Sequence, residues 1–563
     1  MSARQNVMSK RRILLWVVAL AGLFGFRLLF GLSSEFFSED ETQIFLMGLR
    51  YHATAAWPYF GPDVVWTSSE IPGALQALLV GVPLNLVAAP EAPFILLNLL
   101  SMSALMWYAW YICQRIPSAP PWLVVGWLLT LPWTLEFSTH INNPSYVLPA
   151  AIVFFIGFFE AAPIFSTRRL HPALAHALMG FGVTWIMQIH MSWPLLLPYV
   201  FVAWVSRRQE GARALSANAL AFVGGGMLPG LALLPTLLKY GVASGSGGTL
   251  RNLHPHWVSP TAAVVVLARL LSFSSLEILR FLELTTARRL LFLARHWWLT
   301  PLALIVWAVG IVQPLWMLRE WLQSVSRYRD WPAMKGLVVG SALLVYTSYW
   351  FVIERATEAH AFYLLAPVAF MFAAYCWTFV DSPVWRTRAA IVLGVNIAYH
   401  AGLAAGQAPE KSLYKNRDVV AAAIRLKEPE MFGHRRPFAV DAGPAVLQDP
   451  ARPFDSRQDM VVSDATRNLG VRGITLWTFT LRNQNPRVAF RTVMCQTTYR
   501  DAAGAVMDTR QTPIRNIWQP GESRQVLVND GVIGRPFATA VLEVLDAEAL
   551  LPTPSSNNPF QPR

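Results

Sequence analysis

Apolar runs long enough to cross a bilayer recur along this chain from Leu14 to about Ala405. A membrane-spanning helix needs about 20 apolar residues, because the hydrocarbon core is about 30 Å thick and a helix rises about 1.5 Å per residue. Only 14% of the 563 residues are charged, against roughly 25% in an ordinary soluble protein. Most of the chain is therefore predicted to be a mainly α-helical integral membrane protein.

About eleven transmembrane helices are predicted. The uncharged segment 71–90 is interpreted as interfacial or re-entrant instead, because Pro72, Gly73, Pro83 and Pro90 interrupt it. If it crossed the membrane, the side assigned to every later loop would be reversed. The expected helices lie at about 13–32, 92–112, 120–136, 144–164, 172–189, 193–206, 215–238, 298–318, 335–353, 361–380 and 389–406.

The basic residues predict the orientation. The N-terminus carries Arg4, Lys10, Arg11 and Arg12, which places it in the cytoplasm by the positive-inside rule. Every short Arg-rich loop then falls on the same side, and the loops with acids, His or Asn fall outside, including the long loops 33–91 and 239–296. The net charge of +13 thus reports membrane orientation, and no nucleic-acid partner is expected.

From about residue 408 the composition becomes polar, and apolar and polar residues alternate. Stretches such as "GITLWTFTLRN" and "FATAVLEVLD" predict strands, with turns at "NQNP", "DAAGA" and "QPGES". A stretch of helical pattern, "RDVVAAAIRLKE", precedes them. We therefore predict a membrane domain over 1–407, a periplasmic α/β then β-sandwich-like domain over 408–550, and a disordered tail over 551–563.

The stretch after the first apolar run, "SSEFFSEDETQIF", contains Glu35, Glu39, Asp40 and Glu41. One interpretation is that these acids are merely solvated and help orientation. Apolar residues at helical spacing over 44–51 predict that the stretch continues as a helix on the membrane surface. Such a helix holds Asp40 and Glu41 at headgroup level, where a carboxylate suits a general base or a cation ligand that acts on a lipid phosphate.

The order of an N-terminal helix, an outside loop opening with Asp-Glu, "AWPYFGPDV" and a segment led by Pro72 resembles the multispanning glycosyltransferases of the GT-C fold, the protein mannosyltransferase and aminoarabinose transferase-like group. The resemblance covers about residues 10–405, in loop order more than in identities. It implies a polyprenyl-phosphate sugar donor, an inverting reaction at the periplasmic face of a bacterial inner membrane, and an envelope glycan, lipid or protein as acceptor. It also implies Asp40, with Glu41 beside it, as the catalytic carboxylate.

The chain departs from the family pattern in two places. The family often has Lys-Pro-Pro where this chain has "EIPG", so Ile71 replaces the usual phosphate-contacting Lys, and Glu70 stands where some relatives bind metal. The second outside loop, "THINNPSYVL", offers His140, Asn142 and Asn143 in place of the usual Asp. Because Asn cannot act as a base, these residues are expected to contact the acceptor or the sugar, and more of the chemistry falls to Asp40.

The late outside loop, "ERATEAHAFYLLAPVAF", resembles the family segment in which a basic residue precedes a "Y-x-x-x-P" helix start. Arg355 is expected to clamp the lipid phosphate there, since a guanidinium binds phosphate through two hydrogen bonds. Glu358 and His360 are expected to line the same site. Snorkelling of Arg355 to the membrane surface is the competing interpretation. His190, at a helix end, is either an acceptor contact or a hydrogen-bonded structural residue.

No cofactor is certain from the residues, and a divalent metal ion is left open, with Glu70, His254 and His256 as candidate ligands. The preferred function is a glycosyltransferase. The alternatives are a transporter or flippase, or a polymerase or ligase, of lipid-linked glycans. A transporter would show inverted repeats and charges inside its spans. The sequence shows no internal repeat, and nearly all candidate polar groups lie outside the predicted helices.

Overall fold

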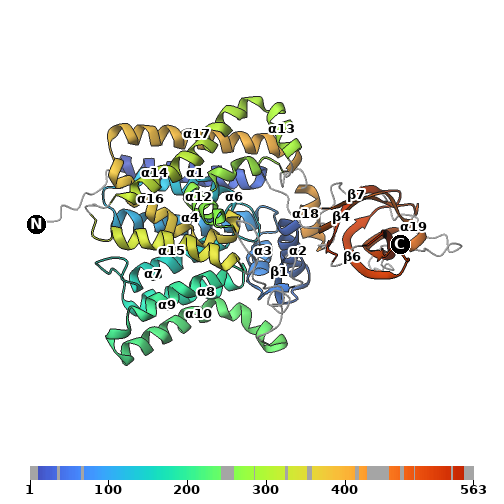
Figure 1. Ribbon diagram of the computed structural model, residues 1–563, viewed down its shortest axis with the longest axis horizontal. Coiled ribbons are helices and arrows are strands. Elements are labelled where there is room, and N and C mark those ends of the chain that lie inside the picture. The colour runs from blue at the N-terminus through green and yellow to red at the C-terminus, as the bar shows by residue number, and fades with distance from the viewer. Residues whose placement is uncertain are drawn as a thin grey trace, which may run out of the picture. The chain divides into compact units, whose positions relative to one another are not determined.

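The computed structural model describes residues 10–34, 39–64, 69–241, 259–283, 286–323, 328–350, 358–411, 417–427, 456–469, 474–486, 488–533 and 537–550. The chain divides into two compact units. The first, Met1–Arg417 with Ile424–Pro429, is mainly helical, and the second, Asp418–Ala423 with Glu430–Arg563, contains the strands of a β-sandwich (Figure 1).

Within the described residues, six helical stretches are long and apolar enough to cross a membrane. This confirms a mainly α-helical membrane protein. The six are α1 (Lys10–Ser33), α4 (Ala92–Arg115), α10 (Ala212–Tyr240), η4 with α14 (Trp297–Leu299 and Thr300–Leu322), η5 with α16 (Ala359–Leu365 and Ala366–Val380) and α17 (Pro383–Lys411).

The other predicted spans are also helical but shorter. The expected helix at 120–136 is broken at Leu131, which adopts φ −56° and ψ 144°, because a residue before proline is disfavoured in the α conformation and Pro132 follows. The shorter helices are α5 (Pro121–Thr130), α6 (Pro132–Glu136), α7 (Val147–Ala161), α8 (Pro172–Met187), η1 (Trp193–Leu196), α9 (Leu197–Val205), η2 (Arg208–Glu210) and α15 (Trp331–Tyr349).

The first outside region forms two packed helices. The segment 71–90 contains α3 (Leu75–Leu86), whose 12 residues rise about 18 Å and so cannot cross a core of about 30 Å. The predicted surface helix is α2 (Glu39–Thr54), but its apolar side packs on α3 instead of facing lipid. Ile44 and Leu49 are buried, and a Cβ on Gly48 would lie 2.3 Å from Val80 Cγ1. The hairpin strands β1 (Phe60–Val64) and β2 (Ser69–Pro72) join the two helices.

The segment 239–296 is not the loop that the sequence predicted. Where it is described, it contains α12 (Thr261–Ser272), η3 (Ser275–Arg280) and α13 (Thr286–Arg295). Phe273 and Ser274 have φ values of 51° and 63°, and this left-handed pair reverses the chain between α12 and η3. The buried Phe273 ring lies 4.9 Å from the ring of Trp127 and 5.2 Å from that of Phe370. The α12–η3 hairpin is therefore built into the helical unit.

The Arg-rich loops that the charge pattern assigned to one side lie together. Arg115 pairs with the buried Glu160, and Arg207 Nη2 donates to the Glu160 carbonyl at 3.1 Å. Ser166 N donates to Asp330 Oδ1 at 2.8 Å. We call this region the Arg-rich end, formed by residues 114–119, 161–171, 206–211, 328–330 and 381–388.

The loops assigned to the other side also meet. His140 Nε2 donates to the Ser34 carbonyl at 3.0 Å. The ring centroids of Phe137 and His360 are 6.2 Å apart, and a Cβ on Gly73 would lie 2.6 Å from a side-chain atom of Gln188. We call this region the α2 end, formed by Ser34 and residues 39–64, 69–74, 137–146, 188–192, 259–283 and 358–365. The predicted grouping of the loops is thus confirmed, while the cytoplasmic placement of the Arg-rich end stays a prediction.

The strands of the second unit form two antiparallel three-stranded sheets, in the orders β3-β4-β7 and β6-β5-β8. Trp477 and Phe479 of one sheet share a hydrophobic core with Phe490 and Trp518 of the other, which confirms a β-sandwich. The helix α18 (Arg417–Leu426) is divided between the two units. The elements after it are α19 (Ser456–Asp459), β3 (Met460–Leu469), β4 (Ile474–Asn483), β5 (Ala489–Arg500), β6 (Val506–Trp518), β7 (Ser523–Val532) and β8 (Thr539–Leu550). The predicted tail at 551–563 lies outside the described residues.

Candidate functional site

Five titratable side chains from two distant parts of the chain gather at the α2 end. Arg280 Nη2 lies 2.6 Å from Glu358 Oε2, and the same oxygen lies 3.5 Å from His360 Nδ1. Arg269 Nε lies 2.8 Å from Glu277 Oε1. Glu277 also interacts electrostatically with Arg280 and Glu358, so the two ion pairs form one group. We call these five residues the charged cluster.

The backbone explains how the cluster forms. Arg269 stands in the last turn of α12, and the left-handed pair that follows returns the chain through η3, so that Glu277 faces back to Arg269. Glu358 precedes η5 in an extended conformation, with φ −79° and ψ 158°, and meets Arg280 at the end of η3. The hairpin and the start of η5 therefore hold the cations and carboxylates together.

The cluster is partly open on one side. The side chains of Arg280 and His360 are each 40% exposed, whereas that of Glu277 is 9% exposed. A guanidinium has five N–H donors, so an arginine that binds one carboxylate keeps donors for a second anion. The open side of the charged cluster can therefore bind an anionic group such as a phosphate.

His190 borders the charged cluster through an electrostatic interaction with His360. Burial, with a smaller contribution from His360, lowers the pKa of His190 to about 3, so the ring is neutral at physiological pH. Its Nδ1 accepts a hydrogen bond from Ser192 N at 3.1 Å. The proton of the neutral ring therefore lies on Nε2, which makes this nitrogen a hydrogen-bond donor.

His140 is fully buried and joins the end of α1 to the loop after α6. Besides its bond to the Ser34 carbonyl, its Nε2 lies 3.2 Å from Ser34 Oγ. Burial lowers the pKa of His140 to about 4. The predicted contact between His140 and an acceptor is not favoured by this arrangement, because the side chain is enclosed and hydrogen-bonded within the protein.

Asp40 and Glu41 stand in the first turn of α2, and their side chains lie outside what the structure describes. Carboxylates at this position stabilise a helix through its dipole, which alone accounts for acids here. Asp40 follows Ser34 by six residues, so their Cα atoms are at most about 22 Å apart. The start of α2 therefore lies within this distance of Ser34, the residue that contacts His140.

The two asparagines of the same loop are half-buried. Asn142 Oδ1 accepts a hydrogen bond from Ser145 Oγ at 2.6 Å, and Asn142 N donates to the same hydroxyl at 2.7 Å. Asn142 thus shapes the turn that precedes α7. The expected contact of Asn142 and Asn143 with a sugar or acceptor stays a prediction.

Of the three candidate metal ligands, only Glu70 lies within the described residues. Glu70 lies exposed in β2, opposite Asp63 of β1 in the strand register. Among the residues that the structure describes, no three His, Cys, Asp or Glu side chains are close enough to hold a metal ion. His254 and His256, and the expected phosphate ligand Arg355, lie outside the described residues. The metal site and the role of Arg355 stay predictions.

Sequence reasoning brought Glu358, His360 and His190 forward but missed their partners Arg269, Glu277 and Arg280. The signal was present in "VVVLARLLSFSSLEILR", where single charges interrupt an otherwise apolar run. Charges in such a setting usually pair with one another and mark functional positions. These charges were not recognised as a site because the segment 239–296 was interpreted as a loop.

No family model matches the chain, and no curated protein does. Among solved structures, the chain is similar to the crystal structure of ArnT from Cupriavidus metallidurans in the apo state. The sequence identity is 11%, the match covers 75% of this chain and 78% of that chain, and the TM-score is 0.43. A likeness of this strength decides neither the fold family nor the activity.

Proposed function

We propose that this chain transfers a sugar from a polyprenyl-phosphate donor to a cell-envelope glycan, lipid or protein, with its site at the α2 end. The observation that carries the proposal is the charged cluster, in which carboxylates hold two arginines at one end of a membrane-spanning unit. The acids that begin α2 are tethered to the same end. A lipid phosphate requires cations at this level, and an acceptor hydroxyl requires a base.

In the proposed reaction, the Asp40 carboxylate removes the proton from the acceptor hydroxyl while the oxygen attacks the anomeric carbon of the sugar. The new bond from carbon to acceptor oxygen forms on the face opposite the lipid phosphate. The bond from carbon to phosphate oxygen breaks with its electron pair, so the configuration at carbon inverts. The products are the glycosylated acceptor and polyprenyl phosphate, and the proton stays on Asp40 until water removes it.

Arg280 is proposed to stabilise the leaving phosphate, which gains a negative charge as the bond breaks. Glu358 fixes the guanidinium in advance, and a fixed donor stabilises developing charge without reorganising in the transition state. Arg269, held by Glu277, adds a second positive charge close by. His190 is proposed to donate a hydrogen bond from its Nε2–H to a hydroxyl of the sugar or acceptor, and it keeps its proton.

The membrane setting of the proposal follows the loop grouping. The α2 end is proposed to face the periplasm of a bacterial inner membrane, and the N-terminus and the Arg-rich end the cytoplasm. The β-sandwich, which follows α17 in the chain, is proposed to lie on the periplasmic side and to help hold the acceptor.

The test is donor turnover by purified protein in lipid, measured as release of polyprenyl phosphate from a panel of polyprenyl-phosphate sugars. Wild type should release it, and Asp40→Asn should not. Asp508→Asn serves as the matched control, since Asp508 belongs to an exposed ion pair with Arg510 in the sandwich. Thermal melting of all three proteins checks that the fold is kept.

The result that would overturn the proposal is binding of these donors by wild type without cleavage in the presence of envelope acceptors. Transfer of intact lipid-linked donor across proteoliposome membranes would instead establish the transporter or flippase. Unimpaired turnover by Asp40→Asn would leave the transferase standing but remove Asp40 as its base, and Glu41→Gln would then be tested in the same assay.

A further inference from the structure

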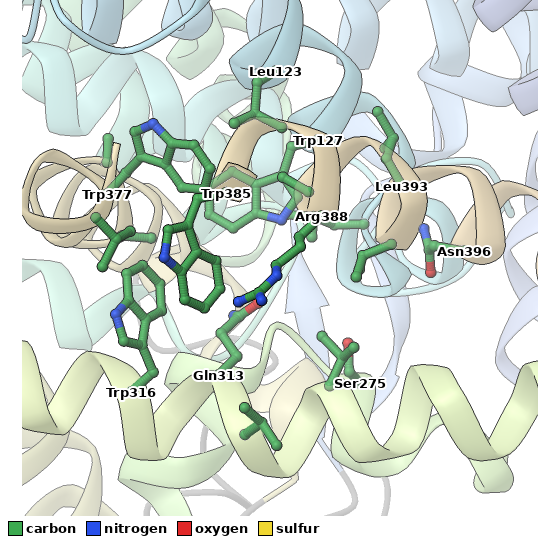
Figure 2. Close-up of a pocket in the computed structure, with 18 of the residues that line it drawn as sticks. Leu123, Trp127, Ser275, Gln313, Trp316, Trp377, Trp385, Arg388, Leu393 and Asn396 are labelled. Atoms are coloured by element: carbon green, nitrogen blue, oxygen red, sulfur yellow. The ribbon is translucent and has the colours of Figure 1, made fainter. Parts of the chain in front are cut away.

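A largely apolar cavity of about 610 Å³ lies in the helical unit, lined mainly by α5, α14, α16 and α17 (Figure 2). Leu123, Trp127 and Leu393 contribute to its apolar lining. The lining also includes Val312 and Leu315 of α14, two residues that are 63% and 62% exposed. Because these exposed apolar side chains belong to a membrane-spanning helix, the cavity opens sideways toward the hydrocarbon.

Two cations stand in this apolar lining. Arg319 and Arg388 line the cavity, and Figure 2 shows Arg388 pointing into it toward Gln313, with tryptophan side chains beside it. The Arg388 guanidinium lies 4.9 Å from the ring centroid of Trp385. Among the described residues, no carboxylate is within ion-pair distance of Arg388, whereas Arg386 pairs with Asp381 at 2.8 Å.

The cations occupy the part of the cavity at the Arg-rich end. Arg319 stands in the last turn of α14, and Arg388 lies near the beginning of α17. The part toward the α2 end carries uncharged polar groups, among them Ser275 of η3 and Asn396. From Ile305 to Arg319, the α14 residues along the cavity rise about 21 Å, more than the roughly 15 Å of one leaflet.

We propose that this cavity binds one anionic phospholipid from the leaflet at the Arg-rich end. The phosphate would lie at Arg388 and Arg319 and supply the negative charge that Arg388 lacks among the described residues. An acyl chain would fill the apolar part. Tryptophans at this depth suit the boundary between headgroups and hydrocarbon. Basic pockets between transmembrane helices are known to bind the acidic headgroups of lipids.

The positions of the arginines distinguish the site of this phospholipid from the proposed site of the sugar donor. The donor phosphate is proposed to lie at Arg280, at the α2 end, whereas the cavity cations Arg319 and Arg388 lie at the Arg-rich end. One lipid phosphate cannot occupy both places. The phospholipid site is therefore independent of the proposed transferase activity, and its failure would leave that activity untested.

The experiment compares wild type, Arg388→Gln and the matched control Arg386→Gln, purified in detergent from the same membranes. Bound phospholipid is extracted and quantified by mass spectrometry. The delipidated proteins are then melted with phosphatidylglycerol or with phosphatidylcholine of the same acyl chains. Wild type and Arg386→Gln should retain about one anionic phospholipid per chain, and only phosphatidylglycerol should raise their Tm. Arg388→Gln should retain at least tenfold less and show no such shift.

A second variant covers the case in which Arg388→Gln fails to fold. Val312→Trp fills the cavity while both cations remain, and it should also lose the bound phospholipid. Equal retention by Arg388→Gln and wild type, or equal Tm shifts with both lipids, would refute the proposal. Recovery of polyprenyl phosphate in place of phospholipid, lost on Arg388→Gln, would also refute it, because the cavity would then belong to the donor.

Discussion

The Arg280 guanidinium lies 2.6 Å from the Glu358 carboxylate, and this contact joins the α12–η3 hairpin to the start of η5. We expect Arg280→Gln to reduce kcat/KM for the lipid-linked donor by roughly 10- to 100-fold. A hydrogen bond to a charged group contributes about 1.5–3 kcal/mol, and about 1.4 kcal/mol corresponds to tenfold. Steady-state release of polyprenyl phosphate measures the change.

Arg386→Gln is the control for this prediction, because it also removes an arginine from an ion pair with a carboxylate, but at the Arg-rich end. Its turnover should equal that of wild type. Glu358→Gln keeps the cation and weakens only its positioning, so its loss should be smaller than that of Arg280→Gln. Full activity of Arg280→Gln with saturable donor kinetics would show that the charged cluster does not hold the phosphate.

His140 predicts a dependence of stability on pH. Its pKa is lowered to about 4 in the folded protein, against about 6.5 when unfolded. Between these values the unfolded chain binds a proton that the folded chain does not, so stability is full above pH 6.5 and falls as the pH drops toward 4. This group contributes up to about 3 kcal/mol of that loss.

The measurement is Tm of wild type and His140→Gln at a series of pH values from 8 to 4. The variant is expected to have a lower Tm at pH 8 and a shallower fall below pH 6.5, because it lacks the group that titrates. His171→Gln, which changes an exposed histidine outside this buried contact, is the matched control. Parallel curves for wild type and His140→Gln would contradict the assignment.

Most of the fold could be predicted from the sequence, because the length of an apolar run and the alternation of apolar and polar residues both follow from which side chains are buried. The six membrane-length helical stretches and four of the six sandwich strands were predictable from them, whereas α12 and α13 were not. The remaining two, β3 and β6, were not, since polar stretches such as "SDATRN" and the proline at 513 interrupt their alternation. The break before Pro132 divides one predicted span. The proline itself indicated this break, because the residue before a proline is disfavoured in the α conformation.

The site was predictable only in part, because its geometry depends on contacts between distant segments. The resemblance pointed to the late loop that contains Glu358 and His360. Nothing local in the sequence shows that Phe273 and Ser274 turn the chain, and that turn is what brings Arg280 to Glu358. Apolar spacing identified α2 as a helix but could not distinguish a partner helix from lipid as the cover of its apolar side.

The contact between α8 and α10 depends on glycine. A Cβ on Gly225 would lie 1.9 Å from the Ala177 carbonyl oxygen, so the helices touch backbone to backbone, as small residues permit in membranes. Gly225→Ala should therefore separate the helices and lower Tm clearly. At Gly224 an added Cβ meets nothing within 4 Å, so Gly224→Ala should be neutral or slightly stabilising, since Ala favours helix over Gly by about 1 kcal/mol. Equal melting of the two variants would contradict this packing.

Glu160 predicts a large loss of stability at the Arg-rich end. Its buried carboxylate accepts hydrogen bonds from Tyr111 Oη at 2.7 Å and Arg169 N at 2.6 Å and pairs with Arg115, whose side chain is 4% exposed. Glu160→Gln leaves that guanidinium buried without its countercharge, which typically costs about 3–5 kcal/mol. The double variant Arg115→Met with Glu160→Gln removes the uncompensated charge as well and should recover part of the lost Tm. If the double variant melted below Glu160→Gln by the full effect of Arg115→Met alone, the two residues would be energetically independent and the pair would not stabilise this end.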